Sequence, residues 1–251
     1  MPLSLPIPQA SGRSKLYSRF LSATLPPHTS ENGAHFDLRV KAILLDLDGT
    51  IGNTLPLCIT AFRESIEPLV GRTLTDDEIV ATFGPSEEGT IAVLLPEQRA
   101  EGLDRYLRRY EELHCRWPSP FEGIPEILSY LKAKRIFVGL ITGKGRRSTE
   151  LTLENYGLED YFDVIKTGAS SGPVKDRRIE EVIEEFSLAR EEILYVGDAP
   201  SDVKACRDYN IKIAAAAWAP TANAAELEQM RPDFLFSSVL AFSDFLRKNL
   251  E

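Results

Sequence analysis

The stretch DLDGT, residues 46–50, ends the apolar run VKAILLD, residues 40–46. A short continuous apolar run is typical of a strand that is buried on both faces of a sheet. Side chains two residues apart in a strand point the same way, so we expect Asp46 and Asp48 to lie together where this strand ends. Gly49 allows the chain to turn there. Two adjacent carboxylates are costly unless a cation joins them or one is protonated, so the pair indicates a functional site.

Further apolar runs predict five more strands, and helical patterns separate most of them. This alternation is typical of an α/β fold with a doubly wound parallel sheet. Such sheets place their sites at the carboxyl ends of strands. The predicted strands are 40–46, 136–141, 162–165, 193–197, 211–215 and 234–236, and the predicted helices are 123–134, 146–156, 179–186, 202–209 and 238–250.

Residues 54–121 interrupt the alternation, because only helical patterns occur there. The clearest pattern runs from Pro96, which suits a first helical position, to Trp117, with apolar residues three and four positions apart. We therefore expect an inserted all-helical subdomain. Within it, the loop FGPSEEG (83–89) is the candidate for substrate specificity, and Arg63 is a candidate for binding a substrate carboxylate.

The first 39 residues differ from the rest, since they are rich in proline and serine and no acidic residue occurs among the first 30. They also contain the basic stretch RSKLYSRFL (13–21). This composition is typical of a disordered tail or of an organellar transit peptide. The widely spaced Cys58, Cys115 and Cys206 form no disulfide framework, which favours a reducing compartment. We expect a cytoplasmic protein, or an organellar one if residues 1–39 act as a transit peptide.

The charge and the histidine content exclude several classes of protein. A net charge of −9 argues against a nucleic-acid-binding protein, which usually carries a basic surface. No run approaches 18 apolar residues, which argues against a membrane span. The three histidines, two of which precede the first predicted strand, argue against a Ser-His-Asp triad and a histidine-rich zinc site. Catalysis is therefore expected to depend on carboxylates, hydroxyls and lysines.

Two other predicted strands also end in polar residues. Thr142, Gly143 and Lys144 follow the second strand, and their hydroxyl, backbone N–H and ammonium suit a phosphate. Asp198 follows the strand 193–197, and Asp202 lies about one helical turn further on, so it can face back towards Asp198. Carboxylates at strand ends are natural oxygen ligands for Mg²⁺. For Asp198, a helix N-cap is the alternative interpretation.

The order of these residues resembles that of the haloacid dehalogenase superfamily of hydrolases, in its phosphoglycolate-phosphatase-like branch. DLDGT matches the first motif, Thr142 the second, Lys175 the third, and GDAPSD (197–202) the fourth. The resemblance extends from Val40 to the C-terminus, and the helical insert matches the C1 cap of the family. It implies an N-terminal tail (1–39), a Rossmannoid α/β core (40–53 and 122–251) and a helical cap (54–121).

The third motif departs from the family pattern. It usually continues Lys-Pro-x-Pro, whereas Lys175 is followed by Asp176, Arg177 and Arg178. Lys166 is therefore a remote alternative for the lysine of this motif.

The resemblance also implies a catalytic role for the first motif. Asp46 is expected to be the nucleophile that forms an aspartyl-phosphate, and Asp48 the general acid and base. Mg²⁺ is expected to bind Asp46, the backbone carbonyl of Asp48, and Asp198, with Asp202 supporting them. Because a halide leaving group needs no proton, Asp48 favours phosphoryl transfer over dehalogenation.

The remaining implied residues bind the substrate. Thr142, Gly143 and Lys175 are expected to hold the phosphoryl oxygens, and Lys144 adds positive charge nearby. The predicted activity is Mg²⁺-dependent hydrolysis of a small phosphate monoester such as phosphoglycolate. Alternatives are a pyrophosphatase or a β-phosphoglucomutase-like phosphotransferase on the same fold, and, less favoured, a non-catalytic binding protein. The expected partner is a small phosphorylated metabolite, not a nucleic acid or a membrane, bound by a monomer or a homodimer.

Overall fold

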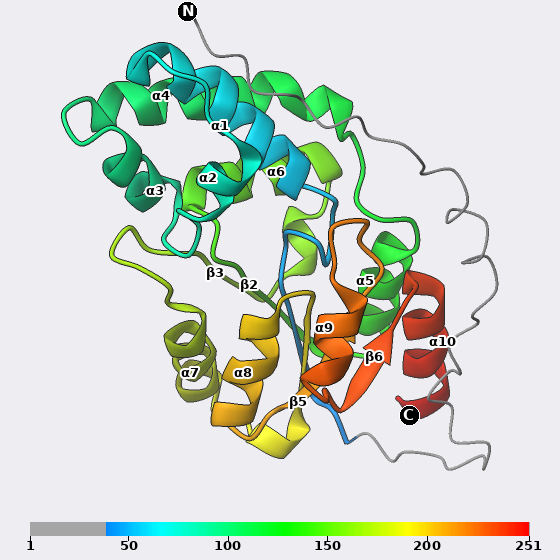
Figure 1. Ribbon diagram of the computed structural model, residues 1–251. Coiled ribbons are helices and arrows are strands. Elements are labelled where there is room, and N and C mark those ends of the chain that lie inside the picture. Colours follow the sequence, from blue (N-terminus) through cyan, green and yellow to red (C-terminus); the bar gives the residue numbers. More distant parts are fainter. Residues whose placement is uncertain (1–38, 251) are drawn as a thin grey trace, which may run out of the picture. The chain divides into compact units, whose positions relative to one another are not determined.

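A six-stranded parallel sheet forms the centre of the computed structural model, which describes residues 39–250 (Figure 1). Its strands are β1 (Ala42–Leu45), β2 (Phe137–Ile141), β3 (Val164–Lys166), β4 (Ile193–Gly197), β5 (Lys212–Ala216) and β6 (Phe234–Phe236). They lie in the order β3-β2-β1-β4-β5-β6, so the direction of progress along the sheet reverses between β1 and β4. Ligands of open α/β sheets bind at such a reversal, outside the carboxyl ends of the strands. The predicted parallel α/β fold is confirmed.

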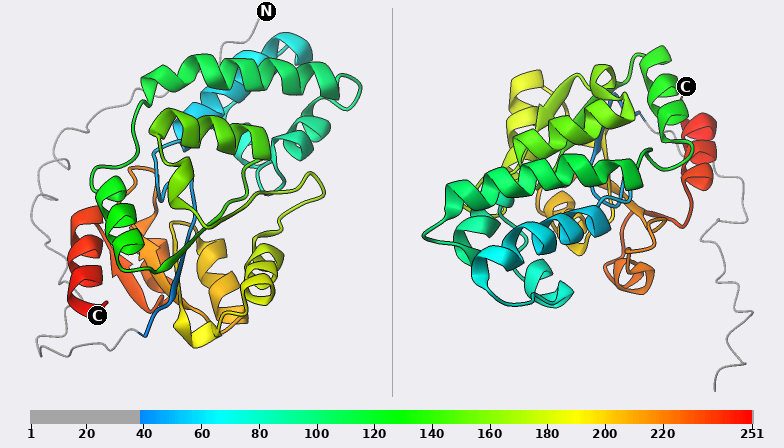
Figure 2. Two further views of the ribbon diagram at one scale, coloured as in Figure 1. Left: turned by 180° about the vertical axis from the view of Figure 1, so that it is seen from behind. Right: turned by 90° about the horizontal axis from the view of Figure 1, so that it is seen from above.

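Helices cover both faces of the sheet, because successive residues of its strands point to opposite sides. Ala42 and Leu44 of β1 are buried in one apolar cluster, whereas Ile43 and Leu45 are buried in the other. The two layers of helices lie on opposite sides of the strands (Figure 2). The first cluster includes α7 (Lys175–Phe186), α8 (Pro200–Asp208) and α9 (Ala224–Gln229), and the second includes α5 (Ile124–Ala133), α6 (Arg146–Tyr156) and α10 (Val239–Asn249).

Between β1 and β2 the chain forms the predicted helical insert, which we call the cap helices: α1 (Leu55–Val70), α2 (Asp76–Val80), α3 (Glu87–Leu94) and α4 (Arg99–Leu113). A third apolar cluster holds them together, and Phe62 and Tyr106 lie at its centre with ring centroids 4.2 Å apart. Leu151 of α6 belongs to the same cluster, so the cap helices also pack on the core. Short 3₁₀ turns lie at His114–Arg116, Glu159–Tyr161 and Arg190–Glu192.

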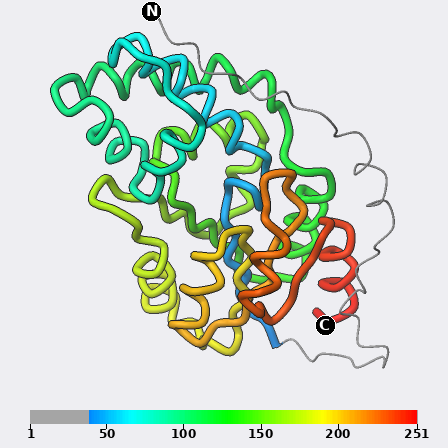
Figure 3. Tube along the Cα trace, in the orientation of Figure 1, coloured from blue at the N-terminus to red at the C-terminus, as the bar shows by residue number. Residues whose placement is uncertain are grey.

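The chain enters and leaves the cap helices at one place, as the trace in Figure 3 shows. The backbone N–H of Phe121, on the return segment, donates to the carbonyl of Ile51 at 2.9 Å. The indole N–H of Trp218 donates to the carbonyl of Thr50 at 3.0 Å, which ties the same loop to the end of β5. These bonds fix the loop that follows Asp48.

Two helices begin elsewhere than their sequence patterns predict. α7 begins at Lys175 and not at Ile179, because its first turn is polar and carries no apolar signal. α4 begins at Arg99 and not near Pro96, which lies in a turn. The predicted tail, residues 1–39, falls almost entirely outside the described residues. Within them, no helix combines the length and the apolar composition needed to cross a bilayer, and all three cysteines are free thiols.

The burial of β1 makes a stability prediction. Leu44 is fully buried, so Leu44→Ala should lower the free energy of unfolding by about 2–5 kcal/mol through lost apolar contact and the cavity left behind. Urea unfolding followed by circular dichroism measures the change. Leu240 is 71% exposed, so Leu240→Ala is the control and should change stability by less than about 0.5 kcal/mol. Equal effects of the two substitutions would contradict the described packing.

Candidate active site

Three carboxylates meet at the carboxyl ends of β1 and β4. Asp46, Asp198 and Asp202 each place an oxygen so that all three oxygens lie within 4.8 Å of one another. Gly49 makes this approach possible, because a Cβ there would lie 2.0 Å from a carboxylate oxygen of Asp198. Gly49 also has φ +79°, in the left-handed region that favours glycine. The close approach of Asp198 therefore explains why a glycine occupies this position of DLDGT.

Lys175 joins two of these carboxylates. Its Nζ lies 2.6 Å from Asp46 Oδ2 and 2.7 Å from Asp202 Oδ1. Burial alone would lower the pKa of Lys175, but the charges of Asp202 and Asp46 outweigh it and raise that pKa well above its usual value. The lysine thus stays charged, and it lies where the third-motif lysine of the sequence analysis is expected. Lys166, the alternative, instead pairs with Glu185.

The carboxylates carry more negative charge than Lys175 balances. Burial, opposed by Lys175 but reinforced by Asp202, raises the pKa of Asp46 to about 7. Burial and the charges of Asp46 and Asp202 raise the pKa of Asp198 to about 8. A buried set of three close carboxylate oxygens fits Mg²⁺, which prefers oxygen ligands and relieves such repulsion. Asp202 already bonds Lys175, and its other oxygen accepts from the N–H of Ala199 at 3.2 Å, so it supports the cluster from behind.

Asp48 lies apart from the three clustered carboxylates and is half-buried. Its Oδ1 accepts a hydrogen bond from the Thr54 hydroxyl and lies 3.2 Å from the Nζ of Lys144. Asp46 and Asp48 thus have separate cationic partners, Lys175 and Lys144. That separation allows the two carboxylates to have different chemical roles.

The residues after β2 lie beside the same edge of the sheet. The buried Thr142 hydroxyl accepts from the backbone N–H of Lys144 at 3.2 Å. A Cβ at Gly143 would meet no atom within 4 Å, so this position is open. Lys144 Nζ instead lies against the cap helices, 3.0 Å from Cys58 Sγ and 4.7 Å from the ring centroid of Tyr110. Whether these residues bind phosphate stays a prediction.

Glu87, the first residue of α3, is the buried charged residue of the site that sequence reasoning did not single out. Its carboxylate accepts hydrogen bonds from the backbone N–H of Gly145 and the hydroxyl of Ser148. The preceding N–H of Ser86 donates to the carbonyl of Ala169 at 3.0 Å. The loop 83–89 therefore packs on the core. The adjacent pair Glu87 and Glu88 is the sequence feature that could have pointed to a buried carboxylate here.

Arg63, the candidate for binding a substrate carboxylate, has its partners within the cap region. Its guanidinium pairs with Asp76 and donates to the carbonyl of Leu74 at 3.3 Å. Substrate binding by Arg63 stays a prediction.

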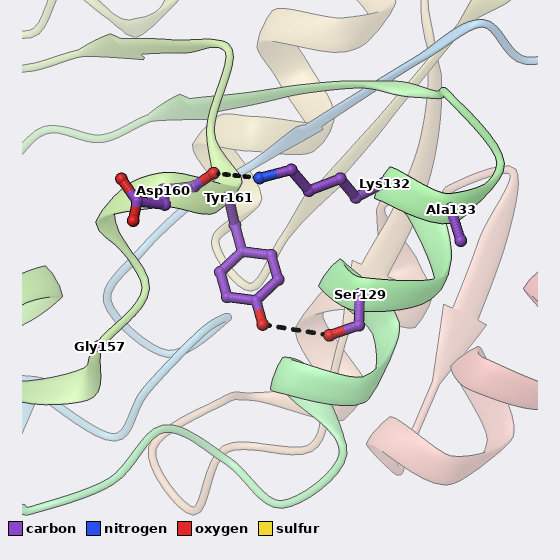
Figure 4. Close-up of a pocket in the computed structure, with 6 residues that line it drawn as sticks. All are labelled: Ser129, Lys132, Ala133, Gly157, Asp160 and Tyr161. Atoms are coloured by element: carbon purple, nitrogen blue, oxygen red, sulfur yellow. Dashed lines mark hydrogen bonds between the residues drawn. The ribbon is translucent and has the colours of Figure 1, made fainter.

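A pocket of about 560 Å³ lies between α5 and the turn that precedes β3, and none of the predicted site residues lines it (Figure 4). Lys132 donates across it to the carbonyl of Asp160 at 2.8 Å, and the hydroxyls of Ser129 and Tyr161 lie 3.1 Å apart. Its polar groups bond to each other, so it offers no comparable chemistry.

The raised pKa values of Asp46 and Asp198 predict how metal binding depends on pH. Without metal, the folded state holds protons on these carboxylates that the unfolded state has already lost, so stability falls as pH rises from about 4 to about 8. Mg²⁺ needs the ionised carboxylates, so its stabilisation should grow over the same range. We expect millimolar Mg²⁺ to raise the Tm by about 3–5 °C at a pH of about 8.5 and by less at about 5.5.

Thermal unfolding by circular dichroism checks this prediction. Asp198→Asn should lose the Mg²⁺ shift, whereas Asp208→Asn, which changes an exposed carboxylate of α8, should keep it. An equal shift at both pH values would contradict the assignment of the metal to these carboxylates.

Comparison with known proteins shows which family and which solved structures this chain resembles. Residues 43–216 match the family model described as haloacid dehalogenase-like hydrolase. The pyrophosphatase PpaX of Bacillus cereus (strain B4264) is 27% identical over 204 residues, which cover 80% of this chain and 94% of that protein. Two solved structures share the fold, both with a TM-score of 0.67. One is a predicted phosphoglycolate phosphatase from Haemophilus somnus 129PT, 19% identical, covering 83% of this chain and 97% of its own. The other is a haloacid dehalogenase-like hydrolase from Streptococcus pneumoniae, 22% identical, covering 83% and 99%.

The matched residues include DLDGT, Thr142, Lys175 and GDAPSD, which carried the resemblance in the sequence. The predictions of this superfamily and of an enzyme of its hydrolase class are confirmed. Since the family match covers more than half of the sequence, the chain belongs to the haloacid dehalogenase-like hydrolases.

Proposed function

We propose that this protein is a Mg²⁺-dependent phosphatase of small phosphate monoesters, with Asp46 as the nucleophile. The observation that carries the proposal is the position of Asp46, paired with Lys175 and adjacent to Asp198. An ionised carboxylate beside a fixed ammonium and an oxygen-ligand site suits attack on an anionic phosphorus centre. The family membership of the chain supports the same chemistry.

In the first step, a carboxylate oxygen of Asp46 attacks phosphorus and the bond from phosphorus to the ester oxygen breaks. Asp48 donates its proton to the leaving oxygen, and Asp46 then carries an aspartyl-phosphate. Thr54 orients Asp48, because its hydroxyl bonds the Asp48 carboxylate directly.

In the second step, Asp48, now ionised, takes a proton from water as the water oxygen attacks phosphorus. The bond between phosphorus and Asp46 breaks, which releases inorganic phosphate and restores the carboxylate. Asp46, Asp198 and the backbone carbonyl of Asp48 would hold Mg²⁺, which would supply positive charge that offsets the charge of the phosphoryl oxygens.

Three groups are proposed to bind the phosphoryl oxygens before and during this reaction. Lys175 Nζ lies 2.6 Å from the nucleophilic carboxylate, so it is placed to contact the phosphoryl group as well. The Thr142 hydroxyl and the open backbone position at Gly143 lie at the end of the adjacent β2.

The relatives suggest two kinds of substrate. Phosphoglycolate, a phosphate monoester, follows from the resemblance stated for the sequence. Pyrophosphate is the second candidate, because the relative from Bacillus cereus is named a pyrophosphatase. A phosphotransferase of the β-phosphoglucomutase kind would instead retain its phosphorylated aspartate and depend on a sugar bisphosphate.

We also propose that the protein works in a reducing compartment, on free phosphorylated metabolites. Its three free cysteines include the buried Cys58, which lies beside Lys144, and Cys206. Burial raises the pKa of Cys58 to about 12, so this thiol stays protonated at physiological pH.

Removing the nucleophile tests the proposed function. Asp46→Asn should lower the rate of phosphate release by at least about 10³-fold, because an amide cannot form the covalent intermediate. Phosphate release is measured with Mg²⁺ or with EDTA, from p-nitrophenyl phosphate, phosphoglycolate and pyrophosphate. EDTA should abolish the activity of the unaltered protein.

Asp208→Asn is the matched control, since it makes the same chemical change on the exposed side of α8 and should retain full activity. Near-normal, Mg²⁺-dependent turnover by Asp46→Asn would refute the assignment of the nucleophile. Folding of both variants is checked by thermal unfolding.

A further inference from the structure

One buried carboxylate of the cap helices, that of Glu87, lies near the lysine that pairs with Asp48. Glu87 is only 6% exposed, and its Oε1 lies 3.8 Å from the Nζ of Lys144. Hydrogen bonds from the Gly145 N–H and the Ser148 hydroxyl fix the carboxylate at the first turn of α6. These donors hold Glu87 in place beside Lys144.

The ammonium of Lys144 lies between two carboxylates. It is 3.2 Å from Asp48 Oδ1 on one side and 3.8 Å from Glu87 on the other, and the side chain is 2% exposed. Burial alone would lower the pKa of Lys144, but Asp48 and other neighbours raise it well above its usual value, so the lysine is charged. One positive charge thus faces two acidic groups.

The position of Asp48 suggests where part of the leaving group lies. Because the proposed acid must reach the leaving oxygen, a leaving group that extends from Asp48 towards its partner Lys144 approaches the cap helices. A carboxylate or second phosphate there would meet a lysine whose charge Glu87 already offsets, even when Asp48 is protonated. It would also approach the buried negative charge of Glu87, which is unfavourable in a site that excludes water.

Three other basic residues considered for the site are already paired with acidic groups. Lys175 is held by Asp46 and Asp202, and Arg63 is held by Asp76. Arg146, which follows the loop after β2, is exposed and pairs with its neighbour Glu150.

Neutral hydrogen-bonding groups lie next to Lys144 instead. Its ammonium faces the ring of Tyr110, and Tyr106 and His114 contact that ring in turn, with centroids 5.8 and 5.6 Å away. The Tyr106 hydroxyl and both ring nitrogens of His114 are buried and have no hydrogen-bond partner among residues 39–250. Burial lowers the pKa of His114, so none of these neighbours carries a charge that would offset that of Glu87.

We propose that Glu87 is a specificity-determining residue, which selects phosphate monoesters with an uncharged leaving group over those whose leaving group carries a carboxylate or a second phosphate. This inference rests on the proposed phosphatase function and on the role of Asp48 in it. It ranks polyol and sugar phosphates above phosphoglycolate and pyrophosphate.

Two esters that differ at one group test the proposal. Glycerol 3-phosphate ends in a hydroxymethyl group where 3-phosphoglycerate has a carboxylate. Their Ki values are measured as competitors of p-nitrophenyl phosphate hydrolysis with Mg²⁺, which gives a result whether or not either ester is turned over. The unaltered protein should bind glycerol 3-phosphate at least about 10-fold more tightly, since like charges close together are strongly unfavourable.

Glu87→Gln removes the charge but keeps one oxygen that can accept from the Gly145 N–H, while its amide N–H can donate to the Ser148 hydroxyl. It should shift the ratio of the two Ki values towards 3-phosphoglycerate by about 10- to 100-fold. Glu87→Asp retains the charge and should keep the original preference. Glu101→Gln, on the exposed surface of α4, removes the same charge elsewhere in the cap helices and should leave the ratio unchanged.

The outcomes separate this inference from the proposed function. Equal Ki values of the two esters for the unaltered protein would overturn the role of Glu87 even if Glu87→Gln does not fold. An unchanged ratio in a folded Glu87→Gln variant would overturn it as well, while hydrolysis of p-nitrophenyl phosphate would still support the phosphatase. No Mg²⁺-dependent hydrolysis of p-nitrophenyl phosphate would refute the proposed function, and this inference with it.

Discussion

Repulsion among buried carboxylates is the constraint on which the site depends. Asp46, Asp198 and Asp202 converge because parallel strands bring their carboxyl ends to one edge of the sheet. Lys175 offsets part of the charge, since it contacts two of the three carboxylates. Burial, together with the remaining excess of negative charge, raises the pKa of Asp46 and of Asp198. The sheet thus holds these acids in an arrangement that a divalent cation would complete.

A second charged cluster, formed by Asp48, Lys144 and Glu87, connects the core to the cap helices. Asp48 comes from the loop after β1, Lys144 from the loop after β2, and Glu87 from α3. The contact of Glu87 with Lys144 therefore depends on the position of α3 relative to the sheet. The cluster of Asp46, Asp198 and Asp202, in contrast, draws every carboxylate from the core. In the proposed mechanism, chemistry at phosphorus and recognition of the leaving group are thus assigned to different parts of the chain.

The sheet and the residues at its carboxyl edge were predictable, because alternating elements and strand-end acids are local signals. Asp46, Asp198 and Lys175 meet as expected from their motifs, although their roles stay proposals. The contact of Glu87 with Gly145 was not predictable, because it joins residues 58 positions apart through a buried side chain. The pairing of Arg63 with Asp76 was not predictable for a similar reason, since the two residues lie in different helices. Local patterns give the elements, whereas such contacts depend on how the elements pack.

The bond between Phe121 and Ile51 has a consequence for how this fold can vary. It closes the entry and exit of the cap helices into a single short neck next to the loop after β1. An insertion whose two ends meet can change in length or composition without altering the register of the strands on either side. Ile51, which forms one side of the neck, comes directly after DLDGT, so a new set of helices placed there would still begin next to Asp46 and Asp48. In this architecture, one contiguous segment can be replaced while the strands that carry the candidate site stay the same.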